Sequence, residues 1–149
     1  MKSFSICITF LILSFATINA QRSNIQIKDA WVRPSAAGSN TALFFVLNNT
    51  GDVPDTLVRA ESNVADIVEV HETYKKDNDK MGMREVKFVA VPAKSKVEFK
   101  PRELHVMFID LQKDLRIGDE IEAVLNLKHA GKIKVKAVVK DMPAMNMNH

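Results

Sequence analysis

The chain has 149 residues, of which 46% are hydrophobic and 26% are charged. These fractions are close to the averages of globular proteins, so they exclude a wholly disordered or fibrous chain, and the length suits one domain. The 21 basic and 18 acidic residues are interspersed along the chain and give a formal charge of +3. Because the basic residues form no cluster, the sequence argues against a nucleic-acid partner.

The first twenty residues are organised like a secretory signal peptide. Lys2 precedes an apolar run from Phe4 to Phe15, and Ala20 is a small residue suited to the position before a cleavage site. The run is shorter than the ~20 apolar residues of a transmembrane helix. We therefore expect residues 1–20 to be cleaved and the mature protein to be exported without a membrane span. No Leu-x-x-Cys pattern lies near the cut, which argues against a lipid anchor.

Cleavage after Ala20 would remove Cys7, the single cysteine of the chain. The mature protein would then have neither a disulfide nor a thiolate metal ligand. This excludes an electron-transfer protein of the blue-copper class, whose site needs a cysteine thiolate with two histidines. No nucleophile–base grouping or pair of carboxylates stands out, so we expect a protein that is not an enzyme.

The mature chain is predicted to be all-β. Short runs rich in Val, Ile and Phe are separated by turn-forming segments such as Asn48–Pro54 and His129–Lys132, and no stretch has a sustained helical period. This pattern is typical of β-sandwiches and β-barrels, and we expect a single domain over residues 21–140 with a tail at 141–149. The expected strands are Ile25–Val32, Asn40–Leu47, Asp55–Ala60, Ala65–His71, Met83–Val89, Lys96–Lys100, Leu104–Leu111, Glu120–Leu127 and Ile133–Val139.

Histidine and methionine are predicted to share the outer face of three of these strands. Successive side chains of a strand point to opposite faces, so each strand offers one row to the core and one to the outside. The predicted inward residues are Val68, Val70, Val86, Phe88, Leu104, Val106 and Phe108. The residues expected on the opposite face are His71, Met83, His105 and Met107.

The methionines are segregated beside histidines, which favours metal binding over core filling. Strands such as Ile25–Val32 and Glu120–Leu127 contain none, whereas Met81, Met83 and Met107 lie near His71 and His105, and the tail holds Met142, Met145, Met147 and His149. Thioether sulfur is a neutral, soft donor that prefers Cu(I), and imidazole also suits copper. Zinc favours cysteine, or histidine with carboxylate, and calcium favours oxygen ligands. The donor set therefore predicts a Cu(I) site.

Two accessory elements stay open at this point. Met81 has the same strand parity as Met83, and it is either a further thioether ligand or a loop residue. The tail is either a frayed terminus or a tract that binds a second copper.

The ligand spacing resembles that of the PCu(A)C (DUF461) family of periplasmic copper chaperones. Eleven residues separate His71 from Met83, and 21 separate Met83 from His105, which is followed by Met107 at the second position. The resemblance extends over residues 25–139. Its flanking motifs are AWVRPS at 30–35, NNTGD at 48–52, VEVHET at 68–73, MGMREV at 81–86, VPA at 91–93 and HVM at 105–107.

This resemblance implies a cupredoxin-like β-sandwich with an exposed Cu(I) site formed by His71, Met83, His105 and Met107. It also implies delivery of copper to the binuclear copper centre of cytochrome c oxidase, with the oxidase copper subunit or a Sco-type thioredoxin-fold chaperone as partner. One position departs from the family pattern: many members have methionine directly after the first histidine, where this chain has Glu72.

Two other functions remain open from the sequence. The same site and tail would also suit sequestration of periplasmic copper for tolerance. A β-sandwich interaction module with incidental histidines and methionines is the alternative without metal.

Overall fold

The computed structural model describes residues 23–76 and 80–142, which form strands and no helix, so no helix in this part of the chain could cross a membrane. The predicted signal peptide and the tail from residue 143 onward lie outside the described residues. The strands are β1 (Ile25–Val32), β2 (Thr41–Asn49), β3 (Asp55–Ser62), β4 (Ala65–Lys75), β5 (Met81–Glu85), β6 (Val89–Val91), β7 (Ser95–Phe99), β8 (His105–Leu111), β9 (Glu120–Leu127) and β10 (Gly131–Val139).

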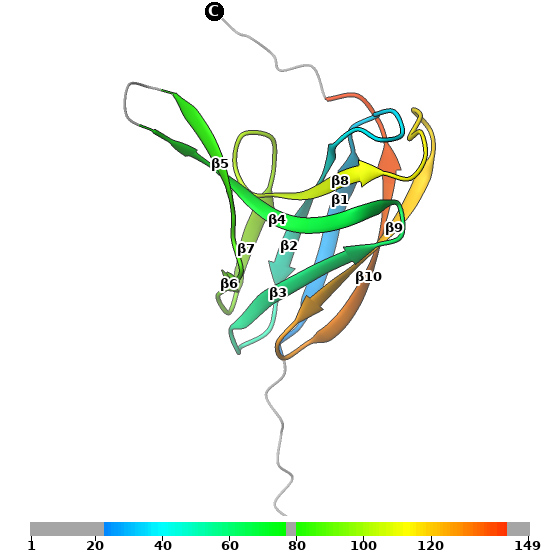
Figure 1. The fold of residues 1–149 in the computed structure, drawn as a ribbon. Helices are drawn as coiled ribbons and strands as arrows, with labels where there is room; N and C mark the ends of the chain where they lie inside the picture. Colours follow the sequence, from blue (N-terminus) through cyan, green and yellow to red (C-terminus); the bar gives the residue numbers. More distant parts are fainter. Residues whose placement is uncertain (1–22, 77–79, 143–149) are drawn as a thin grey trace, which may run out of the picture.

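The strands form one hydrogen-bonded sheet that curls over on itself. Their order is β5-β4-β8-β2-β1-β10-β9-β3-β6, and β7 also pairs with β2. β1 and β10 are parallel, and the other pairs are antiparallel. The curled sheet encloses a single apolar core (Figure 1). This confirms the predicted all-β class.

The core is built from the inward rows of nearly all strands. Val106 and Phe108 of β8 are fully buried, as are Leu43 of β2 and Leu125 of β9, and Val70 is the last core residue of β4. Burial of a Leu or Phe side chain stabilises the fold by roughly 1.5–3 kcal/mol. One core of this kind supports a domain of this length without a disulfide.

The predicted strand Met83–Val89 is wrong. The chain leaves β5 at Glu85 at one edge of the sheet and begins β6 at Val89 at the other edge, where β6 pairs with β3. The residues between belong to a crossing segment, so strand alternation does not apply to them. Val86 still packs against the core, but the side chain of Phe88 is 67% exposed, against the prediction of an inward position.

β4 and β5 form an arm that extends beyond the body of the domain. β4 continues for five residues past Val70, and β5 contributes no residue to the core. Figure 1 shows this hairpin projecting from the sheet. β4 therefore extends to Lys75, beyond the predicted end of this strand at His71.

A β-bulge in β1 creates a second, smaller apolar cluster on the outer face of the sheet. The pairing of β1 with β2 shifts before Trp31, where Asp29 has a positive φ of 54°. Trp31 then packs on Phe44 with ring centroids 4.6 Å apart, beside Ala42. Met107 packs against this cluster, which therefore supports one of the predicted copper ligands from below.

A buried carboxylate ties together three segments at the start of β3. Asp55 accepts hydrogen bonds from the Ser23 hydroxyl and from the backbone N–H groups of Thr56, His129 and Ala130. Burial by itself raises the pKa of Asp55, but these four hydrogen bonds outweigh it and hold the pKa below its ordinary value. The carboxylate thus joins the N-terminal segment and the β9–β10 turn to β3.

We predict that Asp55→Asn lowers the free energy of unfolding by about 1–3 kcal/mol at pH 7, because an amide cannot accept all of these hydrogen bonds. Since folding lowers the Asp55 pKa, its contribution is present above the ordinary carboxyl pKa of about 3.9 and is lost as pH falls through the lowered value. Urea unfolding between pH 7 and pH 3 measures both effects.

The matched control is Asp52→Asn, which changes an exposed carboxylate that pairs with Lys94 at the surface. Its effect should stay within about 0.5 kcal/mol. Equal stabilities for the Asp55 and Asp52 variants would show that the buried hydrogen bonds do not stabilise the fold.

Candidate metal centre

Strand register places the two predicted histidine ligands directly opposite each other. His71 of β4 pairs with His105 of β8, and directly opposed residues of antiparallel strands share one face. Their ring centroids are 6.0 Å apart, and the rings meet edge to face. The pair lies on the outer side of the sheet, opposite the core row that contains Val70 and Val106.

The two methionines flank this pair along the strand direction. Met107 is opposite Glu69, and Met83 is opposite Thr73, so each methionine is a diagonal neighbour of His71 on the same face. Diagonal neighbours are within reach of long side chains. The methionine side chain has three rotatable bonds and can bend toward the rings from either side. The structure thus brings all four predicted residues to one face, with the thioethers on opposite sides of the histidines.

His105 presents an unprotonated nitrogen toward this face. Its Nδ1 lies 2.9 Å from the carbonyl oxygen of Glu103, and because a carbonyl only accepts, Nδ1–H is the donor and Nε2 keeps its lone pair. Burial lowers the pKa of His105; the hydrogen bond to Glu103 raises it in part, and the charges of His71 and Arg33 lower it further. The neutral, metal-binding form is therefore favoured near neutral pH.

In His71 the ring nitrogen left unprotonated is Nδ1, whereas in His105 it is Nε2. Its Nε2 lies 2.7 Å from Oε2 of Glu69, so Nε2–H donates to the carboxylate and Nδ1 carries the free lone pair. That Nδ1 is buried without a hydrogen-bond partner. An unsatisfied buried polar atom costs roughly 1–3 kcal/mol. A carboxylate that holds the far N–H of a histidine is a recurrent device of metal sites, because it fixes the ring and its tautomer.

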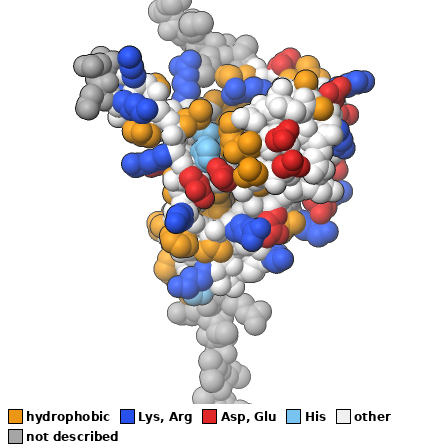
Figure 2. Space-filling view, viewed as in Figure 1, with side chains coloured by type: hydrophobic (Ala, Val, Ile, Leu, Met, Phe, Trp, Pro, Cys, Tyr) orange, Lys and Arg blue, Asp and Glu red, His pale blue; other side chains and the backbone are white. Residues whose placement is uncertain are grey.

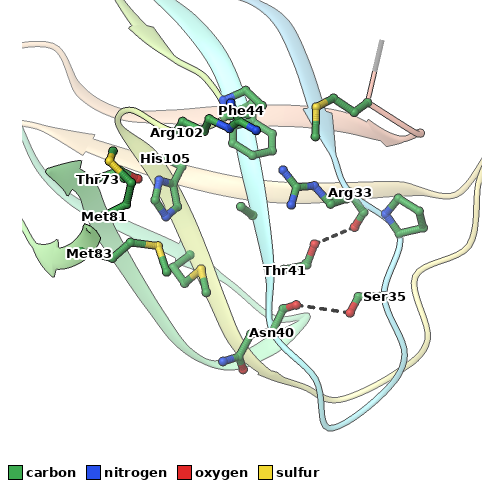
Figure 3. A pocket seen from close by; sticks show the side chains of 16 residues that line it. Arg33, Ser35, Asn40, Thr41, Phe44, Thr73, Met81, Met83, Arg102 and His105 are labelled. Carbon is green, nitrogen blue, oxygen red and sulfur yellow. Dashed lines mark hydrogen bonds between the residues drawn. The ribbon is translucent and has the colours of Figure 1, made fainter. Parts of the chain in front are cut away.

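The thioethers face a cavity of about 760 Å³. Figure 3 shows Thr73, Met81, Met83 and His105 together on one side of the cavity, with Arg33 across from them. Met81 and Met83 are more than half exposed, whereas His105 is only 5% exposed, so the predicted exposed site is open at its thioether side alone. The lining residues are Arg33, Pro34, Ser35, Asn40, Thr41, Ala42, Phe44, Thr73, Met81, Gly82, Met83, Pro101, Arg102, His105, Met107 and Met142.

The accessory residues divide into two groups. Met81 lies opposite Lys75 on the same face as Met83, and Met142 lines the same cavity. Met145, Met147 and His149 lie outside the described residues.

Glu72, the position at which this chain departs from the expected family pattern, pairs with Arg84 on the other face of the arm and does not point toward the histidines.

Sequence reasoning missed three neighbours of the site. Glu69 lies two residues before His71, so strand alternation alone could have placed it on the same face. Arg33 lies within the AWVRPS motif, but nothing local indicated that it would meet a segment seventy residues further on. Phe44, whose ring centroid is 6.3 Å from that of His105, looked like an ordinary strand residue.

The described residues contain no group of three or more His, Cys, Asp or Glu side chains placed to hold a metal ion. The site predicted on this face would add the thioethers of Met83 and Met107 to the two histidines. Figure 2 shows the same face, with a histidine surface at its centre, hydrophobic side chains beside it, and Lys and Arg side chains gathered around the arm.

The fold is that of an all-β domain of the cupredoxin-like class. Residues 25–139 match the family model LpqE-like, described as "Putative lipoprotein LpqE-like", and the chain belongs to this family, which is the PCuAC (DUF461) family. The resemblance seen in the sequence is thereby confirmed.

Similar proteins agree with this assignment. The chain is 31% identical over 144 residues to "Putative lipoprotein Lxx21020" of Leifsonia xyli subsp. xyli, with 96% of this chain and 86% of the relative covered. The apo PCuAC domain from PmoF1 superposes with a TM-score of 0.68 at 26% identity, over 82% of this chain and 97% of that one. The solution structure of CuI-DR1885 from Deinococcus radiodurans gives a TM-score of 0.59 at 24% identity, over 83% of both chains, which shows a shared fold.

The names of the family and of the Leifsonia relative contain the word lipoprotein. In this chain the single cysteine is Cys7, outside the described residues. The expectation that the mature protein has no lipid anchor stays a prediction.

Proposed function

We propose that this domain binds one Cu(I) ion between His71, Met83, His105 and Met107. The observation that carries the proposal is the pair of opposed imidazoles, each with one nitrogen hydrogen-bonded to an oxygen acceptor and the other left with a free lone pair. A metal ion would satisfy the buried Nδ1 of His71, which has no partner. The thioethers on both sides of the rings select a soft monovalent ion over zinc or calcium.

The chemistry of these ligands suits a carrier. All four are neutral, so they leave the charge of Cu(I) uncompensated and bind it reversibly. The half-exposed thioethers of Met83 and Met81 leave one side of the ion open to the ligands of a second protein. Thioethers also do not form disulfides in an oxidising compartment, although methionine can be oxidised to the sulfoxide.

We further propose that the protein is a periplasmic copper chaperone without enzymatic activity. Its cargo would pass to the binuclear copper centre of cytochrome c oxidase, directly to the copper subunit or through a Sco-type thioredoxin-fold chaperone. The family membership, the predicted signal peptide and the open side of the site support this proposal.

A second copper in the tail stays a prediction. Met142 lines the same cavity as Met83 and His105, which supports a role for it as an accessory thioether. Met145, Met147 and His149 would then extend the supply of donors beyond the described residues.

We predict that His105→Ala and Met83→Ala each lower the Cu(I) affinity at least tenfold, because loss of even an outer-sphere partner costs 10–100-fold at metal sites. Competition with a chromophoric Cu(I) chelator under anaerobic conditions measures the affinity. His129→Ala is the matched control, since His129 is exposed at the β9–β10 turn and far along the chain from the site. Equal losses in the His129 and His105 variants would contradict the ligand assignment.

Delivery and sequestration predict different outcomes in a transfer assay. A chaperone loaded with one Cu(I) should metallate the soluble copper domain of the oxidase subunit, or a Sco-type protein, faster than chelator-bound Cu(I) at the same free copper. The copper content of each acceptor after its separation from the donor follows the transfer. If neither acceptor gains copper, and a strain without the protein becomes copper-sensitive with normal oxidase, the function is sequestration.

A further inference from the structure

The cavity in front of the thioethers has a charge that copper binding does not explain. Arg33 and Arg102 both line it, and none of the lining residues is acidic. Neither guanidinium is paired with a carboxylate in the part of the chain that the structure describes. A monovalent copper ion held by neutral ligands would add a further positive charge beside them. The carboxylate of Glu69, which is hydrogen-bonded to His71, lies on the same face but does not line this cavity. The cationic side of the cavity therefore favours an anionic occupant.

Strand register fixes the distance between Arg33 and the site. Arg33 follows β1, and its N–H donates to the carbonyl of Ala42, which is itself opposite Met107. Arg33, Ala42 and Met107 thus form a row across three neighbouring strands, each about 4.8 Å from the next. The methyl group of Ala42 is the smallest member of the row, so it leaves open space between the guanidinium and the thioether.

The guanidinium of Arg33 is held toward this space. Its Cζ lies 5.5 Å from the centroid of the Phe44 ring, and the Thr41 hydroxyl donates to the Arg33 carbonyl at 2.7 Å. Figure 3 shows the side chain directed into the cavity toward His105. Five N–H donors in a planar fork are thereby presented to whatever enters beside the metal.

We propose that this cavity is a thiolate-binding site, in which Arg33 and Arg102 attract the anionic sulfur of a copper acceptor to the exposed side of the bound ion. This inference rests on the proposed Cu(I) function. The occupant must be an anion, because the lining is cationic, and it must be soft, because it lies next to Cu(I). Carboxylate and phosphate satisfy the first condition and not the second.

The transfer that follows is a ligand exchange without redox change. The thiolate forms a Cu–S bond while a Cu–thioether bond to Met83 breaks, and copper remains Cu(I) throughout. A second acceptor ligand then displaces the two imidazoles and the thioether of Met107, which leave as neutral groups. Where the incoming group is a thiol, its proton passes to water. Positive charge beside the sulfur favours the thiolate form.

The test compares acceptors that differ in charge. Two synthetic peptides are used, one with a Cys-x-x-Cys pair and one with both cysteines replaced by methionine, and the rate of Cu(I) transfer from the loaded protein is measured for each by stopped flow. The readout is the ratio of the cysteine rate to the methionine rate, so that changes in Cu(I) affinity cancel. Free glutathione serves as a third acceptor. Its rate shows whether a small thiol can occupy the site in place of a protein cysteine.

We expect Arg33→Gln to lower this ratio roughly tenfold, the lower end of the effect that a local charge has on association rates. Arg33→Lys should retain most of the ratio, and higher salt should lower it in the wild type. Arg59→Gln, which removes the same charge from the exposed surface of β3, should leave it unchanged. If the rate of Cu(I) transfer to glutathione depends on Arg33 in the same way, the site accepts free thiols as well as protein cysteines.

An unchanged ratio in Arg33→Gln and Arg102→Gln, in protein that still binds one Cu(I), would overturn the thiolate site and leave the copper function intact. Failure of the wild-type protein to bind Cu(I) would overturn the proposed function instead. Arg33→Lys is the control for misfolding. It keeps the positive charge and the packing on Phe44 and loses only the planar guanidinium.

Discussion

The pairing of His71 with His105 across β4 and β8 is the constraint on which the site depends. A shift of one residue in this register would turn one histidine into the core and the other outward. The register is held by the inward rows of the same strands, since Val70 and Val106 must face the core together. The burial of ordinary aliphatic side chains one position away therefore fixes the positions of the proposed metal ligands.

The site joins a rigid part and an exposed part. His105 and Met107 lie on β8 in the middle of the sheet, with His105 buried and Met107 packed on the cluster of Trp31 and Phe44. Met83 lies on β5, which contributes no residue to the core. In the proposed function the histidines would hold copper in a set position, and the exposed arm would supply the ligand that an acceptor displaces first.

Much of this could be predicted from the sequence because strand alternation is local. The bounds of β1 and β9 agree with prediction, and the parity of His71, His105 and Met107 follows from their apolar neighbours. Phe88 could not be placed, because its exposure depends on the chain leaving one sheet edge for the other. The Nδ1 of His71 and the approach of Arg33 could not be foreseen either, since both depend on pairing between distant strands.

The most direct test of the account is X-ray absorption at the copper edge on the mature protein loaded with one equivalent of Cu(I). The account predicts both sulfur and nitrogen neighbours in the first shell, with about two of each, and loss of one sulfur in Met83→Ala. A shell of nitrogen and oxygen alone would contradict it, because the thioethers would then have no part in holding the ion.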